Sequence, residues 1–309
     1  MDDSTILVLG DPTDPSLAGL AALPDATHIA VGDGVEAFAQ AAPAADVILN
    51  WSGSRELLQQ VWRMAPRVRW VHSRAAGLDD LLFPELAESP VPMTNARGVF
   101  SDILAEFVIG AALFFAKGFR RLVRSQEARL WDQFDTVEVA GQTMGVIGFG
   151  DIGKAVARRA EAMGLHVLPV PRATAQQDKL ALLSRCDYVV LSAPLTPETR
   201  GIVGAAELRA MRPGAVLINV GRGPLVDEAA LVDALREKRI GGAALDVFDQ
   251  EPLPAAHPYY SIDNLLLSPH SADHTSDWKQ RAMQVFLDNF ELYRKGEPLR
   301  NLVDKRRGY

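Results

Sequence analysis

Cysteine, excess positive charge and long apolar runs are all scarce in this sequence. Its 309 residues include one cysteine, Cys186, which has no partner for an intrachain disulfide and no metal-ligand cluster around it. The formal net charge of -7 argues against non-specific binding to nucleic acid. No apolar run is long enough to span a bilayer, and the N-terminus lacks the basic and apolar regions of a signal peptide. We therefore expect a cytoplasmic protein with no metal site and neither a nucleic-acid nor a membrane partner.

The composition is that of an ordinary globular protein. Hydrophobic residues make up 48% and charged residues 23%, without the glycine or proline enrichment of a disordered or fibrous chain. A length of 309 residues favours two domains, because domains usually hold about 100–200 residues each.

A glycine-rich turn is the most specific motif. It joins a strand-like segment, 143–147, to a helix-like segment, 152–163, and consists of Gly148, Phe149, Gly150, Asp151, Ile152 and Gly153. In such a turn the first glycine permits a tight bend, the second lets the backbone approach a pyrophosphate, and the third lets the helix pack on the strand. The helix N-terminus adds unpaired N–H groups and a favourable dipole. The motif predicts a dinucleotide-binding site.

The end of the next strand predicts which dinucleotide is preferred. NAD-binding domains usually carry an acidic residue there to bind the ribose 2′-hydroxyl, but strand 166–170 runs into Pro171, Arg172, Ala173 and Thr174. A guanidinium fork matches phosphate oxygens. Arg172 and Thr174 therefore favour NADP(H), with NAD(H) still possible. The alternative is that Arg172 is an ordinary solvated surface residue.

Apolar segments before the turn indicate a smaller parallel α/β unit. Candidate strands at 5–9, 46–51, 68–73 and 91–94 enclose a helix-like segment, 56–64. A long apolar pattern at 101–121 predicts one interdomain helix, and a helical pattern at 278–294 near the end of the chain is expected to pack back on the first unit. We predict a substrate domain of residues 1–99 and 283–309, and a doubly wound parallel Rossmann domain of residues 100–282.

Candidate site residues lie at or just beyond the carboxyl ends of the later strand-like segments, 188–191, 215–219, 242–247 and 265–267. They are Ala193-Pro194, Arg222, Asp246 with Glu251 downstream, and His270. Ligands of open parallel sheets bind outside the carboxyl ends of the strands, so these residues are expected to converge on one site.

The chemistry of that set favours hydride transfer to a carbonyl. A histidine near neutral pH can give the carbonyl oxygen its proton, and Glu251 would fix the tautomer of His270 and favour the imidazolium. Arg222 would bind a carboxylate on the substrate. The predicted substrate is a small 2-oxo acid or the corresponding 2-hydroxy acid. If each residue is considered alone, the alternative interpretations are that His270 is a structural histidine, that Glu251 is an acidic loop residue and that Asp246 caps a loop. The five other histidines are interpreted as structural.

Three segments carry a resemblance to a known family. Asn219 to Gly223, Asp246 to Pro252 and Ser268 to Ala272 resemble the three signatures of the D-isomer-specific 2-hydroxyacid dehydrogenases. The resemblance covers nearly the whole chain. It implies a catalytic trio of Arg222, Glu251 and His270, and a cofactor cleft lined by Ala193, Pro194, Val220 and Asp246, between the Rossmann domain and a flavodoxin-like substrate domain.

The same resemblance implies properties that the residues alone do not show. The loop Ser73–Gly77, with Arg74, Ala75, Ala76 and Gly77, should bind the substrate, its backbone N–H groups meeting the carboxylate. The turn after strand 166–170 is similar to the corresponding turn of NADP-using glyoxylate and hydroxypyruvate reductases. Members of the family are typically homodimers, and Trp131 resembles a residue that reaches toward the partner's active site; taken alone, it reads as a packing residue.

Two other functions fit the motifs less well. Formate or phosphonate oxidation could use the same fold, but formate dehydrogenases of this superfamily pair the histidine with an amide rather than with a carboxylate such as Glu251. A dinucleotide-sensing module resembling the dehydrogenase-related corepressors would keep the trio but favour NAD. Turnover of 2-oxo acids separates these alternatives.

Overall fold

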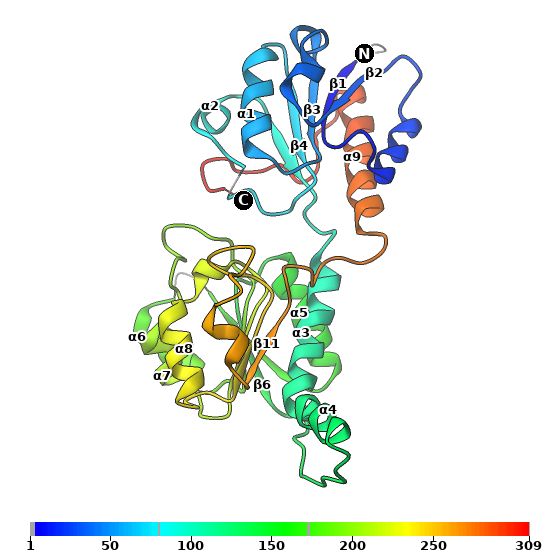
Figure 1. Ribbon diagram of the computed structural model, residues 1–309. Helices are drawn as coiled ribbons and strands as arrows, with labels where there is room; N and C mark the ends of the chain where they lie inside the picture. The colour runs from blue at the N-terminus through cyan, green and yellow to red at the C-terminus, as the bar shows by residue number, and fades with distance from the viewer. Residues whose placement is uncertain (1–3, 80, 172–173, 309) are drawn as a thin grey trace. The chain divides into compact units, whose positions relative to one another are not determined.

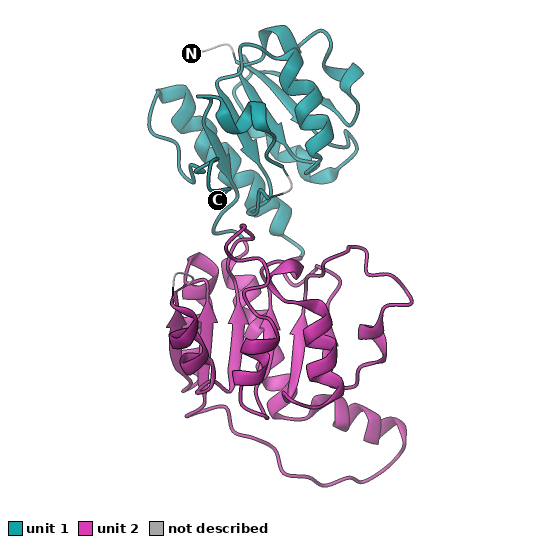
Figure 2. Ribbon diagram, turned by 90° about the vertical axis from the view of Figure 1, so that its left-hand side faces the viewer, with its two compact units in different colours: residues 1–99, 275–309 teal, residues 100–274 magenta. Residues whose placement is uncertain are grey.

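Two parallel β-sheets organise the chain, each in a unit of its own. The computed structural model describes residues 4–79, 81–171 and 174–308. Unit 1 comprises residues 1–99 and 275–309, and unit 2 comprises residues 100–274 (Figure 2). The structure divides the chain between residues 99 and 100 and again between residues 274 and 275. Residues 275–282 group with unit 1 because they lead into α9 (Trp278–Lys295), which packs on η1 (Pro15–Ala22).

Unit 1 contains a five-stranded parallel sheet in the order β2-β1-β3-β4-β5 (Figure 1). The strands are β1 (Thr5–Leu9), β2 (His28–Gly32), β3 (Val47–Asn50), β4 (Trp70–Ser73) and β5 (Met93–Asn95). The connecting helices are η1, η2 (Val35–Phe38), η3 (Ala42–Ala44), α1 (Arg55–Met64) and α2 (Pro84–Glu88). Strand β2 was absent from the sequence prediction. It is an edge strand whose residues are mostly half-buried or exposed, so it lacks the continuous apolar run of the inner strands.

Helix α9 completes the core of unit 1. The ring of Trp70, on β4, stacks on Phe286 with centroids 5.4 Å apart and lies 5.6 Å from the ring of Tyr293. Trp70 and Phe286 are both fully buried. The end of the chain is therefore a structural part of the unit that holds its beginning.

Unit 2 contains a six-stranded parallel sheet in the order β11-β10-β9-β8-β6-β7. The strands are β6 (Thr143–Ile147), β7 (His166–Val170), β8 (Tyr188–Leu191), β9 (Val216–Asn219), β10 (Gly242–Leu245) and β11 (Leu265–Leu267). Helices α3 (Ser101–Ala116) and α5 (Asp151–Ala162) cover one face, and α6 (Gln176–Leu183), α7 (Ala205–Ala210) and α8 (Glu228–Arg236) cover the other (Figure 1). Two short 3₁₀ helices, η4 (Gly223–Leu225) and η5 (Pro258–Ser261), lie in the loops. This is a doubly wound α/β sheet whose strand order reverses between β6 and β8.

The single long helix predicted at 101–121 is wrong. Helix α3 ends at Ala116, and α4 (Phe119–Glu127) begins after Gly118, whose φ of +62° is left-handed. A Cβ at Gly118 would come within 2.8 Å of the Phe134 ring, so glycine is needed for packing as well as for the backbone turn. None of the described helices has the length and apolar character that crossing a membrane requires.

Candidate active site

The strand ends of unit 2 lie at one level. Register pairs Leu191 with Ile147 and with Asn219, and the ends of β7, β10 and β11 continue the same row. The loops that follow these ends carry the catalytic and cofactor residues that the sequence analysis selected in unit 2. The parallel sheet therefore brings those loops to one edge, which is where open α/β sheets bind ligands.

The glycine turn has the shape that a dinucleotide phosphate requires. Gly148 has a φ of +93°, and a Cβ there would lie 2.4 Å from the backbone nitrogen of Ala193. A Cβ at Gly153 would lie 2.3 Å from the Gly148 carbonyl oxygen. A Cβ at Gly150, by contrast, would project into open space, where a phosphate group would need the room. Phe149 is exposed, and Asp151 opens α5, whose N-terminus has no side-chain cap. The turn fits a pyrophosphate bound at the N-terminus of α5.

The turn after β7 lies only partly within the described residues. Arg172 and Ala173 are outside them, while the Thr174 N–H donates to the Pro171 carbonyl at 3.0 Å. Beyond the turn, α6 is tied to α7 by a buried ion pair of 2.8 Å between Lys179 and Glu207. The exit of the turn is therefore anchored to the body of unit 2.

His270 and Glu251 form a hydrogen-bonded pair. The His270 Nδ1–H donates to Glu251 Oε2 at 2.6 Å, because a carboxylate can only accept. The other oxygen, Oε1, accepts the Phe248 N–H at 2.9 Å, which fixes the carboxylate in place. The His270 side chain remains 43% exposed, so its Nε2 edge can meet a substrate. The hydrogen bond orients the imidazole ring and leaves its Nε2 edge accessible, which are two conditions that a histidine needs for proton transfer to a ligand.

The backbone also constrains His270. Its φ is +51°, a left-handed conformation that few residues other than glycine adopt, and its N–H donates to the Asp246 carbonyl at 2.9 Å. Strained residues of this kind are concentrated at functional sites, where the surrounding structure holds them.

Asp246 organises the loop that carries His270. Its Oδ1 accepts the Ser268 hydroxyl at 2.6 Å and the N–H groups of Ser271 and Ala272 at 2.9 and 3.0 Å. Asp246 is buried, so these bonds compensate for its lost hydration. The capping role considered in the sequence analysis is therefore present. Ser268 was not selected from the sequence, although a hydroxyl two residues before the histidine was the available signal.

Arg222 lies at the same edge, in the loop after β9. Its Nη1 donates to the Gly221 carbonyl at 2.7 Å. Asn219 shapes the loop by accepting the Gly221 N–H at 3.0 Å and donating to the Arg222 carbonyl at 2.9 Å. Gly223 allows this loop to pass against Phe248, since a Cβ would lie 2.0 Å from the Phe248 carbonyl carbon. The loops after β9 and β10 are thus in direct contact.

The loop after β8 touches the glycine turn. The hydroxyl of Ser192 donates to the Gly148 carbonyl at 2.7 Å, immediately before Ala193. The buried hydroxyl of Thr199 donates to the Pro194 carbonyl at 2.7 Å and fixes that turn. Val220 is buried and its N–H donates to the Leu191 carbonyl at 3.1 Å. These contacts set the positions of Ala193, Pro194 and Val220 relative to the glycine turn.

A cavity of about 700 Å³ adjoins the His270–Glu251 pair. Its other lining residues include Phe248, Leu253, Tyr260 and Leu267, so most of the wall is apolar. Its size is within the range of small-molecule sites.

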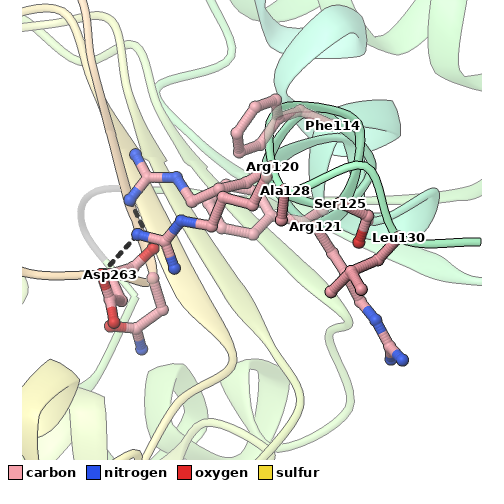
Figure 3. Close-up of a pocket in the computed structure, with 11 residues that line it drawn as sticks. Phe114, Arg120, Arg121, Ser125, Ala128, Leu130 and Asp263 are labelled. Atoms are coloured by element: carbon pink, nitrogen blue, oxygen red, sulfur yellow. Dashed lines mark hydrogen bonds and ion pairs between the residues drawn. The ribbon is translucent and has the colours of Figure 1, made fainter. Parts of the chain in front are cut away.

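A second cavity, of about 550 Å³, lies at the opposite end of β11, between α4 and the segment before that strand (Figure 3). There Arg120 donates to the Asp263 carbonyl and Arg124 pairs with the Asp263 carboxylate at 2.7 Å, which attaches α4 to the sheet.

The selected loop of unit 1 follows β4. The Ala75 N–H donates to the Ser73 hydroxyl at 3.2 Å, and Asn95 donates to the Ala76 carbonyl at 2.6 Å. Within the described residues, the N–H groups of Ala76 and Gly77 have no acceptor. The loop therefore presents two backbone donors that an anion would satisfy.

The titratable groups away from the His270–Glu251 pair were compared with the needs of a metal ion and of a reactive thiol. The described ranges contain no cluster of three or more histidine, cysteine, aspartate or glutamate side chains placed to hold a metal ion. Burial raises the pKa of the Cys186 thiol to about 11, so it is an unreactive core residue. Burial also raises the pKa of Asp273, close to the pair, while His274 opposes that shift.

A doubly wound parallel sheet with a glycine turn after β6 is the architecture of dinucleotide-binding proteins, and a histidine–carboxylate pair at the same edge is suited to proton transfer. Residues 109–272 match the family model described as D-isomer specific 2-hydroxyacid dehydrogenase, NAD binding domain. The chain belongs to the D-isomer-specific 2-hydroxyacid dehydrogenase family and is an oxidoreductase of that class. The family predicted from the sequence motifs is thereby confirmed.

Individual relatives extend over both units. A glyoxylate reductase of Korarchaeum cryptofilum is 34% identical over 264 residues, which cover 80% of this chain and 79% of that protein. A D-3-phosphoglycerate dehydrogenase of Methanocaldococcus jannaschii is 32% identical over 84% of this chain, which spans about half (52%) of its length. Among solved structures, an NADPH-dependent glyoxylate/hydroxypyruvate reductase of Sinorhizobium meliloti in complex with NADP and sulfate has a TM-score of 0.86 and 27% identity. That match covers 99% of this chain and 100% of the other.

Proposed function

We propose that the protein reduces a small 2-oxo acid to the D-2-hydroxy acid, with NADPH as the preferred cofactor and NADH as a possible one. The observation that carries the proposal is the 2.6 Å hydrogen bond between His270 and Glu251 on the wall of the 700 Å³ cavity. The family membership and the glyoxylate reductase relatives support the substrate class.

His270 is the proposed acid. With Nδ1–H bonded to Glu251, the proton that moves is the one on Nε2, which passes to the carbonyl oxygen of the substrate. Glu251 stabilises the charged imidazolium before transfer and keeps the ring in one orientation. Arg222 binds the acid group of the substrate and so orients its carbonyl carbon, which is a contribution of positioning to the rate.

The glycine turn fits a dinucleotide pyrophosphate, and this fit indicates which residues would bind the cofactor. Gly148 to Gly153 would bind the pyrophosphate, and Ala193, Pro194, Val220 and Asp246 would line the rest of the dinucleotide site. Asp246 Oδ1 is occupied by the loop, so Oδ2 is the oxygen proposed to meet the nicotinamide carboxamide. When bound, the nicotinamide supplies the hydride.

Arg172 is the residue proposed to bind the 2′-phosphate of NADPH. The segment Pro171–Thr174 contains no carboxylate to bind a ribose 2′-hydroxyl, and the Sinorhizobium meliloti neighbour is NADPH-dependent. Arg172→Asp should therefore lower the ratio of kcat/KM for NADPH to that for NADH by at least about tenfold, the loss of a charge-assisted bond. Steady-state rates with both cofactors measure this ratio. An unchanged ratio would mean that Arg172 is an ordinary surface residue.

The protein is further proposed to be a homodimer formed through unit 2. Several apolar side chains of α4 and the segment after it are exposed: Phe119, Leu122, Val123, Leu130, Trp131 and Val137. Trp131 is 92% exposed, which is costly for a tryptophan in a monomer. A self-complementary interface would bury this surface.

The experiment that tests the function is a substrate panel. Initial rates of NADPH and NADH oxidation are measured with glyoxylate, hydroxypyruvate, pyruvate, and branched and aromatic 2-oxo acids. NADPH-dependent turnover of any of these supports the proposal. No turnover with either cofactor, combined with tight dinucleotide binding, would favour a sensing role instead.

A further inference from the structure

The cavity of about 700 Å³ beside the His270–Glu251 pair is formed within unit 2. Its described lining residues come from the segment 248–253 after β10, from η5 and from residues 267–270 at the end of β11. Strands β10 and β11 are neighbours in the sheet, so the segments that follow them emerge together at its carboxyl edge. The cavity therefore lies at the same edge of the same unit as the proposed proton donor.

Apolar side chains that the core holds in place make up most of the wall. Phe248 is buried, and the centroid of its ring lies 6.3 Å from that of Tyr259, which is also buried. Leu253 and Leu267 are partly buried and pack against the hydrophobic core of the sheet. The ring of Tyr260 completes the wall and is 58% exposed. The apolar surface is therefore preformed, and an apolar group of a ligand is stabilised by burial on it.

The polar side chains deep in the wall are already hydrogen-bonded. Glu251 accepts the Phe248 N–H at 2.9 Å with one oxygen and the His270 Nδ1–H at 2.6 Å with the other. The hydroxyl of Ser268 donates to Asp246 at 2.6 Å. Among the described residues, none forms a hydrogen bond with His270 Nε2. A ligand in the cavity therefore meets one open imidazole nitrogen and a mostly apolar surface.

The charges of the wall disfavour an acidic side chain on the ligand. His270 is the one basic side chain among the described lining residues, and it is bound to the carboxylate of Glu251. A second anionic group in the cavity would lose hydration without gaining a cationic partner, and it would lie close to the negative charge of Glu251. The cavity therefore selects for apolar side chains and against acidic ones.

The acid group of the substrate has a separate place in the same unit. Arg222, which is proposed to bind it, lies in the loop after β9 and is followed by Gly223. A Cβ at Gly223 would lie 2.0 Å from the carbonyl carbon of Phe248, and Phe248 lines the cavity. The loop that carries Arg222 is thus in contact with the cavity wall, so the acid group and the side chain of one substrate can both be bound by unit 2.

We propose that this cavity binds the side chain of the substrate, so that the preferred 2-oxo acids carry an apolar side chain larger than a methyl group and no second acidic group. The inference rests on the proposed 2-oxo acid reductase function and specifies its substrate class.

A homologous series tests the preference for apolar side chains. The kcat/KM of reduction is measured for pyruvate, 2-oxobutanoate, 2-oxopentanoate and 2-oxohexanoate, which differ by one methylene each. Each added methylene should raise kcat/KM by about fourfold, because that factor corresponds to moving a methylene out of water. Values that stay level along the series would overturn the inference.

A matched pair tests the discrimination against acidic side chains. 2-Oxoglutarate carries a carboxylate where 2-oxopentanoate carries its terminal methyl group. Its kcat/KM should be lower by at least about tenfold, since the carboxylate would be desolvated beside Glu251. A preference for 2-oxoglutarate would contradict the proposed side-chain site.

Tyr260→Ala connects the preference to the cavity, because it removes apolar wall surface and leaves His270 and Glu251 in place. It should lower the ratio of kcat/KM for 2-oxohexanoate to that for pyruvate by about threefold to tenfold. Ile29→Ala, at an exposed apolar residue of β2 in unit 1, is the control and should leave the ratio unchanged. Leu253→Ala is the second variant if Tyr260→Ala does not fold. A ratio that neither cavity variant changes would show that the preference arises elsewhere and would refute the side-chain site.

The outcomes separate this inference from the function on which it rests. If no 2-oxo acid is reduced, the reductase function fails, and binding alone then tests the cavity. Isothermal titration calorimetry gives the dissociation constants of 2-oxohexanoate and pyruvate for the protein saturated with NADP⁺. Tighter binding of 2-oxohexanoate that Tyr260→Ala weakens would support the side-chain site, whereas equal affinities would rule it out.

Discussion

At the scale of single residues, His270 is held by its backbone, its ring and its loop at once. The left-handed φ of +51°, the 2.6 Å bond to Glu251 and the loop bonds to Asp246 Oδ1 leave little freedom for the imidazole. A ring fixed in this way loses little entropy when it meets a substrate.

His270→Ala should lower kcat by about a hundredfold to ten-thousandfold, because the proton donor is removed. The dissociation constant of NADPH should change by less than about threefold, since the residues proposed to bind the dinucleotide are other ones. His166→Ala is the control, because His166 is exposed at the amino end of β7. Steady-state rates and cofactor titration measure both effects. A His270→Ala enzyme that kept most of its activity would refute the proposed acid.

Glu251→Gln removes the negative charge of the Glu251 side chain but keeps its size and shape. The amide oxygen can still accept from the Phe248 N–H and the His270 ring, but it stabilises an imidazolium less well than a carboxylate. The rate of 2-oxo acid reduction should fall, and the loss should grow as the pH rises, because the variant holds the catalytic proton more weakly. The pH profile of kcat/KM measures this. A uniform loss at every pH would indicate that Glu251 acts by orientation alone.

At the scale of elements, the inner strands were predictable because they are continuous apolar runs between turn residues. The edge strand β2 was not, since most of its residues are half-buried or exposed. The interruption between helices α3 and α4 at Gly118 was also not predictable, because the apolar pattern continues past Gly118 and its contact with Phe134 is tertiary.

The sequence was sufficient to predict that the site lies at the carboxyl ends of the strands. The selected residues follow consecutive strands, and parallel pairing then places them at one edge. The contacts themselves were not predictable: Glu251 and His270 are nineteen residues apart, and they meet only because β10 and β11 are neighbours. The guanidinium of Arg74 also lies over the rings of Trp51 and Trp278, and these three residues come from distant parts of the sequence that show no common pattern.

Strand β4 carries a buried histidine that should make unit 1 sensitive to acid. His72 is fully buried and shares a 2.7 Å hydrogen bond with the Thr94 hydroxyl, and burial lowers its pKa to about 3 from an ordinary value of 6.5. Below pH 6.5 the unfolded chain takes up a proton that the folded chain does not. Stability is therefore full above that pH and falls toward pH 3, by up to about 1.4 kcal/mol per pH unit.

Urea unfolding between pH 4.5 and 7.5 checks this prediction. His72→Phe removes the titrating group and should flatten the pH dependence, whatever its effect on stability at neutral pH. Wild-type and variant curves that stay parallel across this range would assign the acid sensitivity to other groups.

At the scale of the whole molecule, the proposed dimer predicts concentration-dependent association. Trp131→Ala should weaken self-association by at least about tenfold, since it removes an exposed aromatic anchor, and should barely change the stability of the protomer. Ile29→Ala, an exposed apolar residue of unit 1, is the control. Sedimentation equilibrium measures both. A wild-type protein that stays monomeric at micromolar concentrations would rule the dimer out.

The path of the chain between the units has a consequence for its synthesis. Unit 2 is one continuous segment, 100–274, whereas unit 1 needs residues 1–99 together with α9. On the ribosome, domains fold as their segments emerge. Residues 1–99 must therefore wait for α9 before the core of unit 1 is complete, whereas residues 100–274 can form unit 2 as soon as they have emerged. We therefore expect unit 2 to complete its fold before unit 1, although the first segment of unit 1 precedes it in the sequence.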